Sequence, residues 1–246
     1  MRRLPVVLLA TLAFAAFAGP PAAPAAAQVR DRAEIERIVR DVIRENPEIV
    51  LEALEALRTR EAKAREEQAR RMLNERREDL LRDPASPVGG NPQGDVTIVE
   101  FFDYQCGYCK TVHGTVKDLL ASDGRIRKVY KEFPILGPGS VLASRAALAS
   151  RGQGKYLAFH DALMEARGAM NEETVLRIAR SVGLDVDRLR RDMNAPEVER
   201  AIRANMALAE ALGIQGTPAF VIGDQVVPGA LELDGLRMLI RRARGS

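Results

Sequence analysis

The chain has 246 residues, enough for one or two domains with a substantial buried core. Hydrophobic residues make up 46% and charged residues 29%, values typical of globular proteins, which excludes a wholly disordered chain. The formal net charge is +3, but Arg2 and Arg3 lie in a segment that we expect to be removed. The remaining charge is nearly balanced, Trp is absent and aromatic residues are only 4%, so the sequence does not indicate a nucleic-acid-binding protein.

The first 27 residues have the pattern of a secretory signal peptide. Arg2 and Arg3 form a short positive segment, residues 4–18 carry no charge, and residues 25–27 are alanines that suit a signal peptidase. A membrane anchor is the alternative, but an apolar stretch over residues 4–18 is shorter than the roughly 20 residues that span hydrocarbon. We therefore expect cleavage after Ala27, a mature chain without a membrane span, and a periplasmic location.

Residues 28–82 are expected to form a helical oligomerisation stalk and linker. Apolar residues recur with helical spacing from Ile35 to Ile43, and Asn46-Pro47 is typical of the start of a second helix. The apolar stripe of that helix continues to Leu57, whereas residues 58–77 are almost wholly polar and predict a solvated linker. Because the linker holds the stripe away from the main domain, we expect residues 31–57 to associate with other copies of the chain.

Residues 83–246 are expected to form an α/β domain. Proline and glycine residues between positions 83 and 92 mark its boundary. Strands are predicted at 96–102 and 126–133, with a helix to about residue 120 between them. A helical stretch over about 137–212 is broken near Gly152, Gly168, Gly183 and Pro196. A hairpin around Gly223-Asp224 and a helix over 233–242 complete an α/β fold with a helical insertion.

The two cysteines, Cys106 and Cys109, flank Gly107-Tyr108 at the predicted start of a helix. A disulfide that closes so small a loop adds little stability, which favours a redox role over a structural one. Free backbone N–H groups and the helix dipole favour an anion at this end, and Cys106 is the more N-terminal thiol. We expect Cys106 to be the nucleophile and Cys109 to resolve the mixed disulfide.

A metal site is a different interpretation of the same pair. A zinc ion takes two more protein ligands, and the only histidines are His113 and His160. His113 lies one helical turn after Cys109, so a partial site is geometrically possible, but we expect packing or surface roles for both histidines. We therefore expect no cofactor and no metal. Copper(I) held by the two thiols remains an alternative.

These features resemble the DsbA family of thiol–disulfide oxidoreductases, which implies a thioredoxin fold. The resemblance rests on the strand ending at Phe102, the Cys-Gly-Tyr-Cys turn, residues 159–163 within the helical insertion, and Thr217-Pro218. Residues 35–57, notably Glu-Asn-Pro-Glu at 45–48, resemble the N-terminal segment of the ScsC branch, suppressor of copper sensitivity, which implies a homotrimer.

The resemblance also implies roles for individual residues. Pro218 is implied to be cis beside the cysteines, so that Thr217 and Pro218, with Gly107 and Tyr108, bind an extended client. Glu100 matches the family's buried acid, and Lys131 matches a basic residue on the neighbouring strand. The two either transfer a proton from Cys109 or form only a structural ion pair.

Two departures bear on the reaction. Gly107-Tyr108 stands where the DsbA oxidase has Pro-His, and Thr217 stands where it has Val, and both resemble the DsbC isomerase. We therefore expect an isomerase or reductase that acts on unfolded or misdisulfided exported proteins and is reset by a redox partner. The alternatives are a DsbA-like net dithiol oxidase and a copper(I)-handling binding protein.

Overall fold

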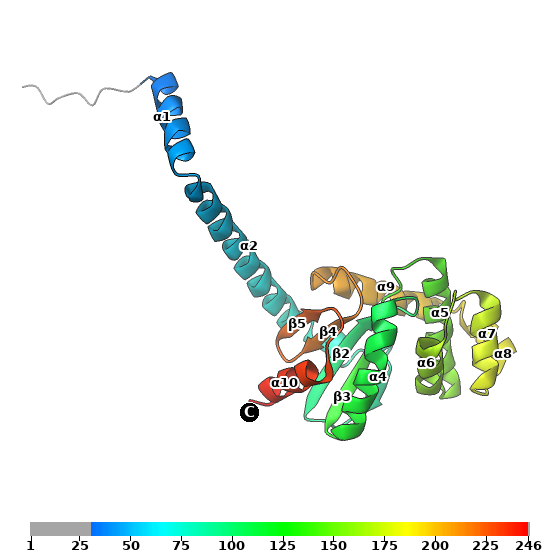
Figure 1. The fold of residues 1–246 in the computed structure, drawn as a ribbon. Coiled ribbons are helices and arrows are strands. Elements are labelled where there is room, and N and C mark those ends of the chain that lie inside the picture. Colours follow the sequence, from blue (N-terminus) through cyan, green and yellow to red (C-terminus); the bar gives the residue numbers. More distant parts are fainter. Residues whose placement is uncertain (1–30, 246) are drawn as a thin grey trace, which may run out of the picture. The chain divides into compact units, whose positions relative to one another are not determined.

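The computed structural model describes residues 31–245 (Figure 1). The expected signal peptide, residues 1–27, lies outside the described residues. The chain divides between Leu57 and Arg58 into two compact units, called here the N-terminal unit and the C-terminal unit. None of the described helices is long and apolar enough to cross a membrane.

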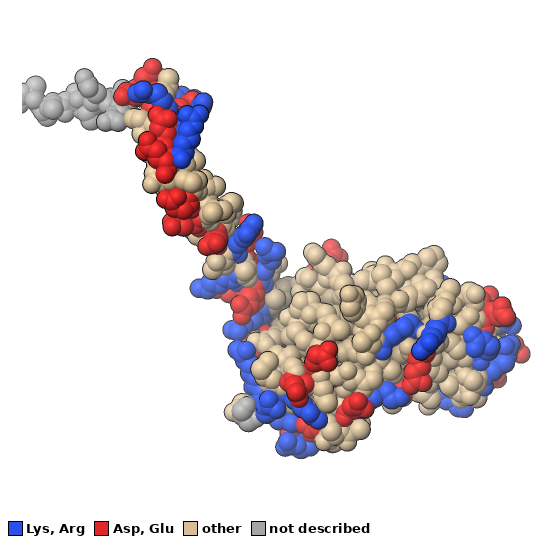
Figure 2. All heavy atoms as spheres, in the orientation of Figure 1, with Lys and Arg blue, Asp and Glu red and all other residues tan. Residues whose placement is uncertain are grey.

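The N-terminal unit is helical. Asp31 caps α1 (Arg32–Glu45), and α2 (Glu48–Glu75) begins after the predicted break at Asn46-Pro47. No residue of α1 is buried, and uncharged surface lies between the charged side chains along this unit (Figure 2). Its large apolar side chains are 36 to 63% exposed: Ile35, Ile38, Val39, Val42, Ile43, Ile49, Val50, Leu51, Leu54 and Leu57. The unit thus has an apolar stripe that its own residues leave uncovered.

A five-stranded sheet forms the centre of the C-terminal unit, in the order β1-β3-β2-β4-β5. The strands are β1 (Val88–Gly90), β2 (Val96–Phe102), β3 (Ile126–Glu132), β4 (Ala219–Ile222) and β5 (Gln225–Pro228). Strands β2 and β3 are parallel and all other neighbours are antiparallel. Together with its covering helices, this sheet has the predicted thioredoxin fold.

Strand β1 lies in the proline- and glycine-rich segment that the sequence indicated only as a domain boundary. A side chain at Gly89 would meet the Tyr130 hydroxyl at 2.8 Å, and Gly90 has a φ of 66°. The two glycines therefore let β1 run close against β3, an approach that side chains would block.

Helices cover both faces of the sheet. One face carries α4 (Gly107–Ser122) and α10 (Leu233–Arg244), whose buried side chains include Val116 and Leu236. The other face buries Phe101 and Val129 against Leu208 of α9 (Pro196–Ala211) and against α3 (Arg77–Leu81). Helices thus cover both faces of the sheet, which agrees with the nearly continuous burial of β2 and β3.

The end of α2 and the short α3 belong to the C-terminal unit. Leu73 is 6% exposed and Leu80 is 2% exposed, and both pack in the core under α9. Helix α2 ends at Glu75, and the prediction of a solvated linker over 58–77 was wrong at its C-terminal end, where Leu73 is buried. Leu73 and Leu80 pack in the core of the C-terminal unit. The boundary between the two units therefore lies before these residues, earlier than the predicted boundary at residues 82–83.

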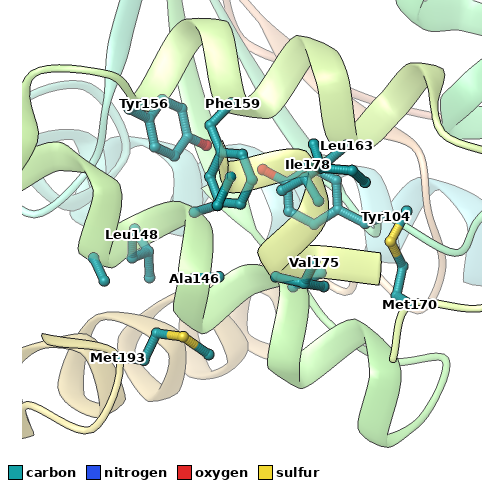
Figure 3. Packing of buried hydrophobic residues seen from close by; sticks show 14 of the residues in the cluster. Tyr104, Ala146, Leu148, Tyr156, Phe159, Leu163, Met170, Val175, Ile178 and Met193 are labelled. Atoms are coloured by element: carbon teal, nitrogen blue, oxygen red, sulfur yellow. The ribbon is translucent and has the colours of Figure 1, made fainter. Parts of the chain in front are cut away.

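The helical insertion follows β3. It consists of α5 (Pro138–Ala149), η1 (Ser150–Gln153), α6 (Tyr156–Glu165), α7 (Glu172–Ser181), α8 (Val186–Asp192) and α9. The predicted breaks near residues 168 and 183 fall between helices, the break near residue 152 falls within the short η1, and Pro196 is the first residue of α9. Phe159 and Leu163 of α6 meet Val175 of α7 in the insertion core, and Tyr104 reaches the same core from the loop after β2 (Figure 3). The insertion is therefore tied to the loop that leads into α4.

Candidate active site

Cys106 is the N-cap residue of α4, with extended backbone angles. Its Sγ accepts a hydrogen bond from the Cys109 N–H at 3.4 Å and donates one to the Thr217 carbonyl at 3.2 Å. The residue is 6% exposed and the surface over this end of α4 is mainly uncharged (Figure 2). The structure thus places the predicted nucleophile at a helix start, where a backbone N–H faces its sulfur.

Cys109 lies one turn further along α4 and is fully buried. Burial raises the pKa of the Cys109 thiol well above its usual value, and the negative charges of Cys106 and Glu100 raise it further. Both cysteines are free thiols in this structure. Cys109 therefore needs a proton acceptor before it attacks a disulfide on Cys106.

The Thr217-Pro218 peptide bond is cis, as the resemblance implied. The Pro218 carbonyl accepts a hydrogen bond from the Gly229 N–H at 2.8 Å, which ties this turn to the end of β5. A cavity of about 730 Å³ begins here, lined by Thr217, Pro218 and Gly229 and, across it, by Gln68 of α2. Because Thr217 both lines the cavity and contacts Cys106, the cavity opens beside the nucleophile.

Gly107 and Tyr108 form the first turn of α4. Tyr108 is 71% exposed, and nothing lies within 4 Å of the position that a Cβ of Gly107 would take. Both residues therefore present open surface next to Cys106.

Asp103 fixes the loop between β2 and Cys106, a role that the sequence reasoning missed. One carboxylate oxygen accepts hydrogen bonds from the Gln105 N–H and the Ser140 hydroxyl, both at 2.7 Å. The other accepts from the N–H groups of Ile135 and Leu136 at 2.9 Å. One buried carboxylate thus holds the segment before the cysteines against the start of α5.

Glu100 pairs with Lys128, and the expected pairing with Lys131 was wrong. The Glu100 Oε2 and Lys128 Nζ atoms are 2.6 Å apart, and both side chains are almost fully buried. Burial lowers the pKa of Lys128, but the charge and hydrogen bond of Glu100, with Tyr130 and Asp161, together outweigh this effect, so the pKa lies above its usual value. Glu100 lies opposite Tyr130 in the β2–β3 register, and successive side chains of a strand alternate between faces. Lys131 therefore points away from Glu100.

Lys131 lies opposite Phe101, on the face covered by α3. Its Nζ donates to the Asp79 carbonyl at 2.7 Å, to the Ser86 hydroxyl at 2.7 Å and to the Asp83 carboxylate at 3.0 Å. Lys131 thus anchors α3 and the segment after it to the sheet, and it has no direct contact with the cysteine pair.

A second buried acid, Glu132, was also missed. Its Oε1 accepts hydrogen bonds from the hydroxyls of Tyr104 at 2.9 Å and Tyr156 at 2.7 Å, and its Oε2 accepts from Ser144 at 2.7 Å. Burial raises the pKa of Glu132 to about 8, although the three hydrogen bonds lower it in part. The partners come from three separate segments, so no local spacing in the sequence signals the cluster.

His113 and His160 are both buried, as a packing role would require. The His160 ring lies 4.8 Å from the rings of Phe102 and Tyr130, in edge-to-face contacts. His113 packs 5.4 Å from His160, centroid to centroid. The structure thus brings together two histidines that are far apart in the sequence.

Two protein families match most of the described chain. The family of DSBA-like thioredoxin domains matches residues 97–241, and the N-terminal domain of copper resistance protein ScsC matches residues 31–64. A thioredoxin-like oxidoreductase from Silicibacter pomeroyi is 55% identical with a TM-score of 0.68, covering 69% of this chain and 98% of that one. A linker-deletion variant of Proteus mirabilis ScsC is 26% identical with a TM-score of 0.69, covering 90% and 99%.

Curated relatives include much longer proteins. The Na⁺/H⁺ antiporter NhaA of Herminiimonas arsenicoxydans is 28% identical over 170 residues, which are 67% of this chain and 27% of the antiporter. The chain spans about a quarter of the length of the curated relatives that it first matches.

Proposed function

Because this chain belongs to the family of DSBA-like thioredoxin domains, we propose that it is a thiol–disulfide oxidoreductase acting on exported proteins. The observation that carries the proposal is the position of the Cys106 sulfur between the N–H of the buried Cys109 and the carbonyl before cis-Pro218. A client segment lying along Thr217 in the adjacent cavity would bring its sulfur to Cys106.

The reaction is thiol–disulfide exchange. The Cys106 thiolate attacks one sulfur of a client disulfide, so that a Cys106–client disulfide forms and a client thiolate leaves. Cys109 then loses its proton and attacks Cys106, which releases a reduced client and leaves an oxidised Cys106–Cys109 pair. In isomerisation a second client thiol displaces Cys106 instead, and no net electrons are transferred.

Glu100 is proposed as the proton acceptor for Cys109. It is buried and lies close enough for its charge to raise the pKa of the Cys109 thiol. The buried Lys128 ammonium, 2.6 Å from Glu100 Oε2, is a fixed counter-charge for this carboxylate. Proton loss from Cys109 is required only in the resolving step, so Glu100 acts on release of the mixed disulfide.

Isomerisation is proposed as the main reaction. Tyr108 leaves the first turn of α4 without an imidazole beside Cys106, and Thr217 precedes the cis-proline, as in the DsbC pattern. The uncovered apolar stripe of residues 31–57 supports self-association, and the ScsC resemblance favours a trimer. Several sites facing one client raise the effective concentration for repeated attack.

Trapping experiments test the cysteine roles. Cys109→Ala should accumulate mixed disulfides with clients, and Cys106→Ala should accumulate few. Full-length enzyme should restore activity to scrambled ribonuclease faster than it oxidises reduced ribonuclease. Faster oxidation would favour the net oxidase. Stoichiometric copper(I) binding by the cysteine pair without ribonuclease activity would favour the metal-handling alternative.

Self-association has its own test. Light scattering should give a trimer for the mature chain and a monomer for residues 58–246, which retain Leu73 and Leu80 in their core. Leu51→Ala, at a side chain that is 63% exposed, should weaken assembly without loss of helix content. A mature chain that is monomeric at micromolar concentration would rule out the assembly.

A periplasmic location is proposed from the leader pattern of residues 1–27 and from the chemistry, because disulfides persist in that oxidising compartment. Fractionation of cells that express the full chain should recover a form beginning at Gln28 in the periplasm. Recovery of an uncleaved chain in the cytosol would contradict this.

A further inference from the structure

Three groups that commonly ligate metals converge between α4 and α6. His113 comes from α4, and His160 and Asp161 are consecutive residues of α6. One ligand atom from each lies within 4.8 Å of the other two. The His113 Nε2 and Asp161 Oδ1 atoms are already 3.4 Å apart.

Two of these ligand atoms lack a hydrogen-bond partner. Across residues 31–245, only three buried side-chain nitrogen or oxygen atoms are unsatisfied, and His113 Nε2 and His160 Nε2 are two of them. The residues are 6% and 1% exposed, so water does not compensate them freely. A buried polar atom without a partner is costly, and two facing the same space indicate a missing group.

The surrounding hydrogen bonds give His160 the form that binds a metal. The Tyr104 hydroxyl donates to Glu132, so its oxygen accepts from the His160 Nδ1–H at 3.0 Å. The proton is thereby fixed on Nδ1, and the lone pair of Nε2 points to the unfilled position. A ligating histidine usually donates its other ring N–H to a fixed acceptor, and here the Tyr104 hydroxyl, oriented by Glu132, is that acceptor.

The charges nearby are compatible with a cation. The Lys128 ammonium is paired with Glu100 at 2.6 Å, and Lys117 lies 3.3 Å from the second Asp161 oxygen, Oδ2. Asp161 Oδ1 lies 3.4 Å from His113 Nε2, and the Asp161 side chain is 38% exposed, which leaves a route for an ion and a water ligand.

We propose that His113, His160 and Asp161 form a binding site for a divalent transition-metal ion of the Zn²⁺ type, separate from the cysteine pair. In tetrahedral zinc sites with bonds of about 2.0–2.1 Å, neighbouring ligand atoms are about 3.4 Å apart. The His113–Asp161 separation already has this value, and one ligand atom from each of the three residues lies within 4.8 Å of the other two, so only a modest closing of the site is needed. Two imidazoles and one carboxylate favour zinc over calcium or magnesium. This departs from the sequence-based expectation of no metal.

The test uses the full mature chain carrying Cys106→Ser and Cys109→Ser, so that thiols do not bind the probe. Competition with a chromophoric chelator should give one Zn²⁺ per chain. Asp161→Asn and His113→Gln should each weaken binding by at least about tenfold, since each removes a ligand. Glu165→Gln is the matched control, because Glu165 contacts the same Lys117 as Asp161 but lies outside the site. The affinity of this variant for Zn²⁺ should be unchanged.

A spectroscopic readout separates this site from other binding. Co²⁺ in place of Zn²⁺ should give visible d–d bands that Asp161→Asn abolishes and Glu165→Gln retains. Circular dichroism of each variant checks that it is folded. Absence of Zn²⁺ binding by the cysteine-free chain would overturn the proposal. If Asp161→Asn and His113→Gln bind Zn²⁺ as tightly as the parent chain, the ion is held elsewhere on the surface, and the proposal is overturned equally.

Discussion

Glu132 predicts an unusual dependence of stability on pH. Its carboxyl group is fully buried under the hydroxyls of Tyr104, Tyr156 and Ser144. Burial raises its pKa to about 8 from an ordinary value of 4.5, more than the three hydrogen bonds lower it. Between these two values Glu132 is protonated in the folded chain and ionised in the unfolded chain.

The sign and size follow from proton linkage. Unfolding releases this proton, so the Glu132 contribution to the free energy of unfolding is complete below pH 4.5 and is lost as the pH rises towards 8. One pKa unit corresponds to about 1.4 kcal/mol, so the whole interval is worth about 5 kcal/mol as an order of magnitude.

Glu132→Gln isolates this contribution. The amide oxygen still accepts from the two tyrosine hydroxyls, and the amide does not titrate. Urea unfolding of the reduced wild type and the variant, at one protein concentration, gives the difference in free energy of unfolding at each pH. The wild type should lose about 3 kcal/mol relative to Glu132→Gln between about pH 5 and about pH 7.

Titration of all other groups cancels in this difference. Glu210→Gln, at an exposed position of α9, serves as the control for removing a carboxylate and should run parallel to the wild type. A difference between wild type and Glu132→Gln that is constant with pH, or that grows as pH rises, would refute the reasoning.

Two further predictions concern the catalytic proton and the packing of α3. Glu100→Gln should slow release of the mixed disulfide more than its formation in stopped-flow exchange, because only release requires Cys109 to lose its proton; equal slowing of both steps would assign Glu100 a structural role. Leu80→Ala should lower the free energy of urea unfolding by about 2–5 kcal/mol, since Leu80 is 2% exposed in the core, whereas Leu157→Ala, at a 42% exposed position, should change it little. A Leu80→Ala effect no larger than that of Leu157→Ala would mean that α3 does not pack as described.

The sequence predicted the features that depend on neighbouring residues. The Cys-x-x-Cys at the start of a helix, the β-branched run of β2, the breaks in the insertion and the hairpin at Gly223-Asp224 are all read over short spacings. Cys106 as N-cap follows directly from that local pattern. Family resemblance added the cis peptide before Pro218, which local spacing alone does not reveal.

Only the tertiary structure decided which distant groups meet. The partner of Glu100 depends on the β2–β3 register, because a shift of one residue moves a side chain to the other face, and that register selects Lys128 over Lys131. His113 of α4 meets His160 only because α6 packs on α4. Glu132 of β3 likewise meets its three hydroxyl partners only because the insertion packs on β3. The spacing of residues in the sequence determines which side chains share one face of a helix or strand. How deeply a side chain is buried, and which faces of two elements contact each other, depend on packing of the whole chain.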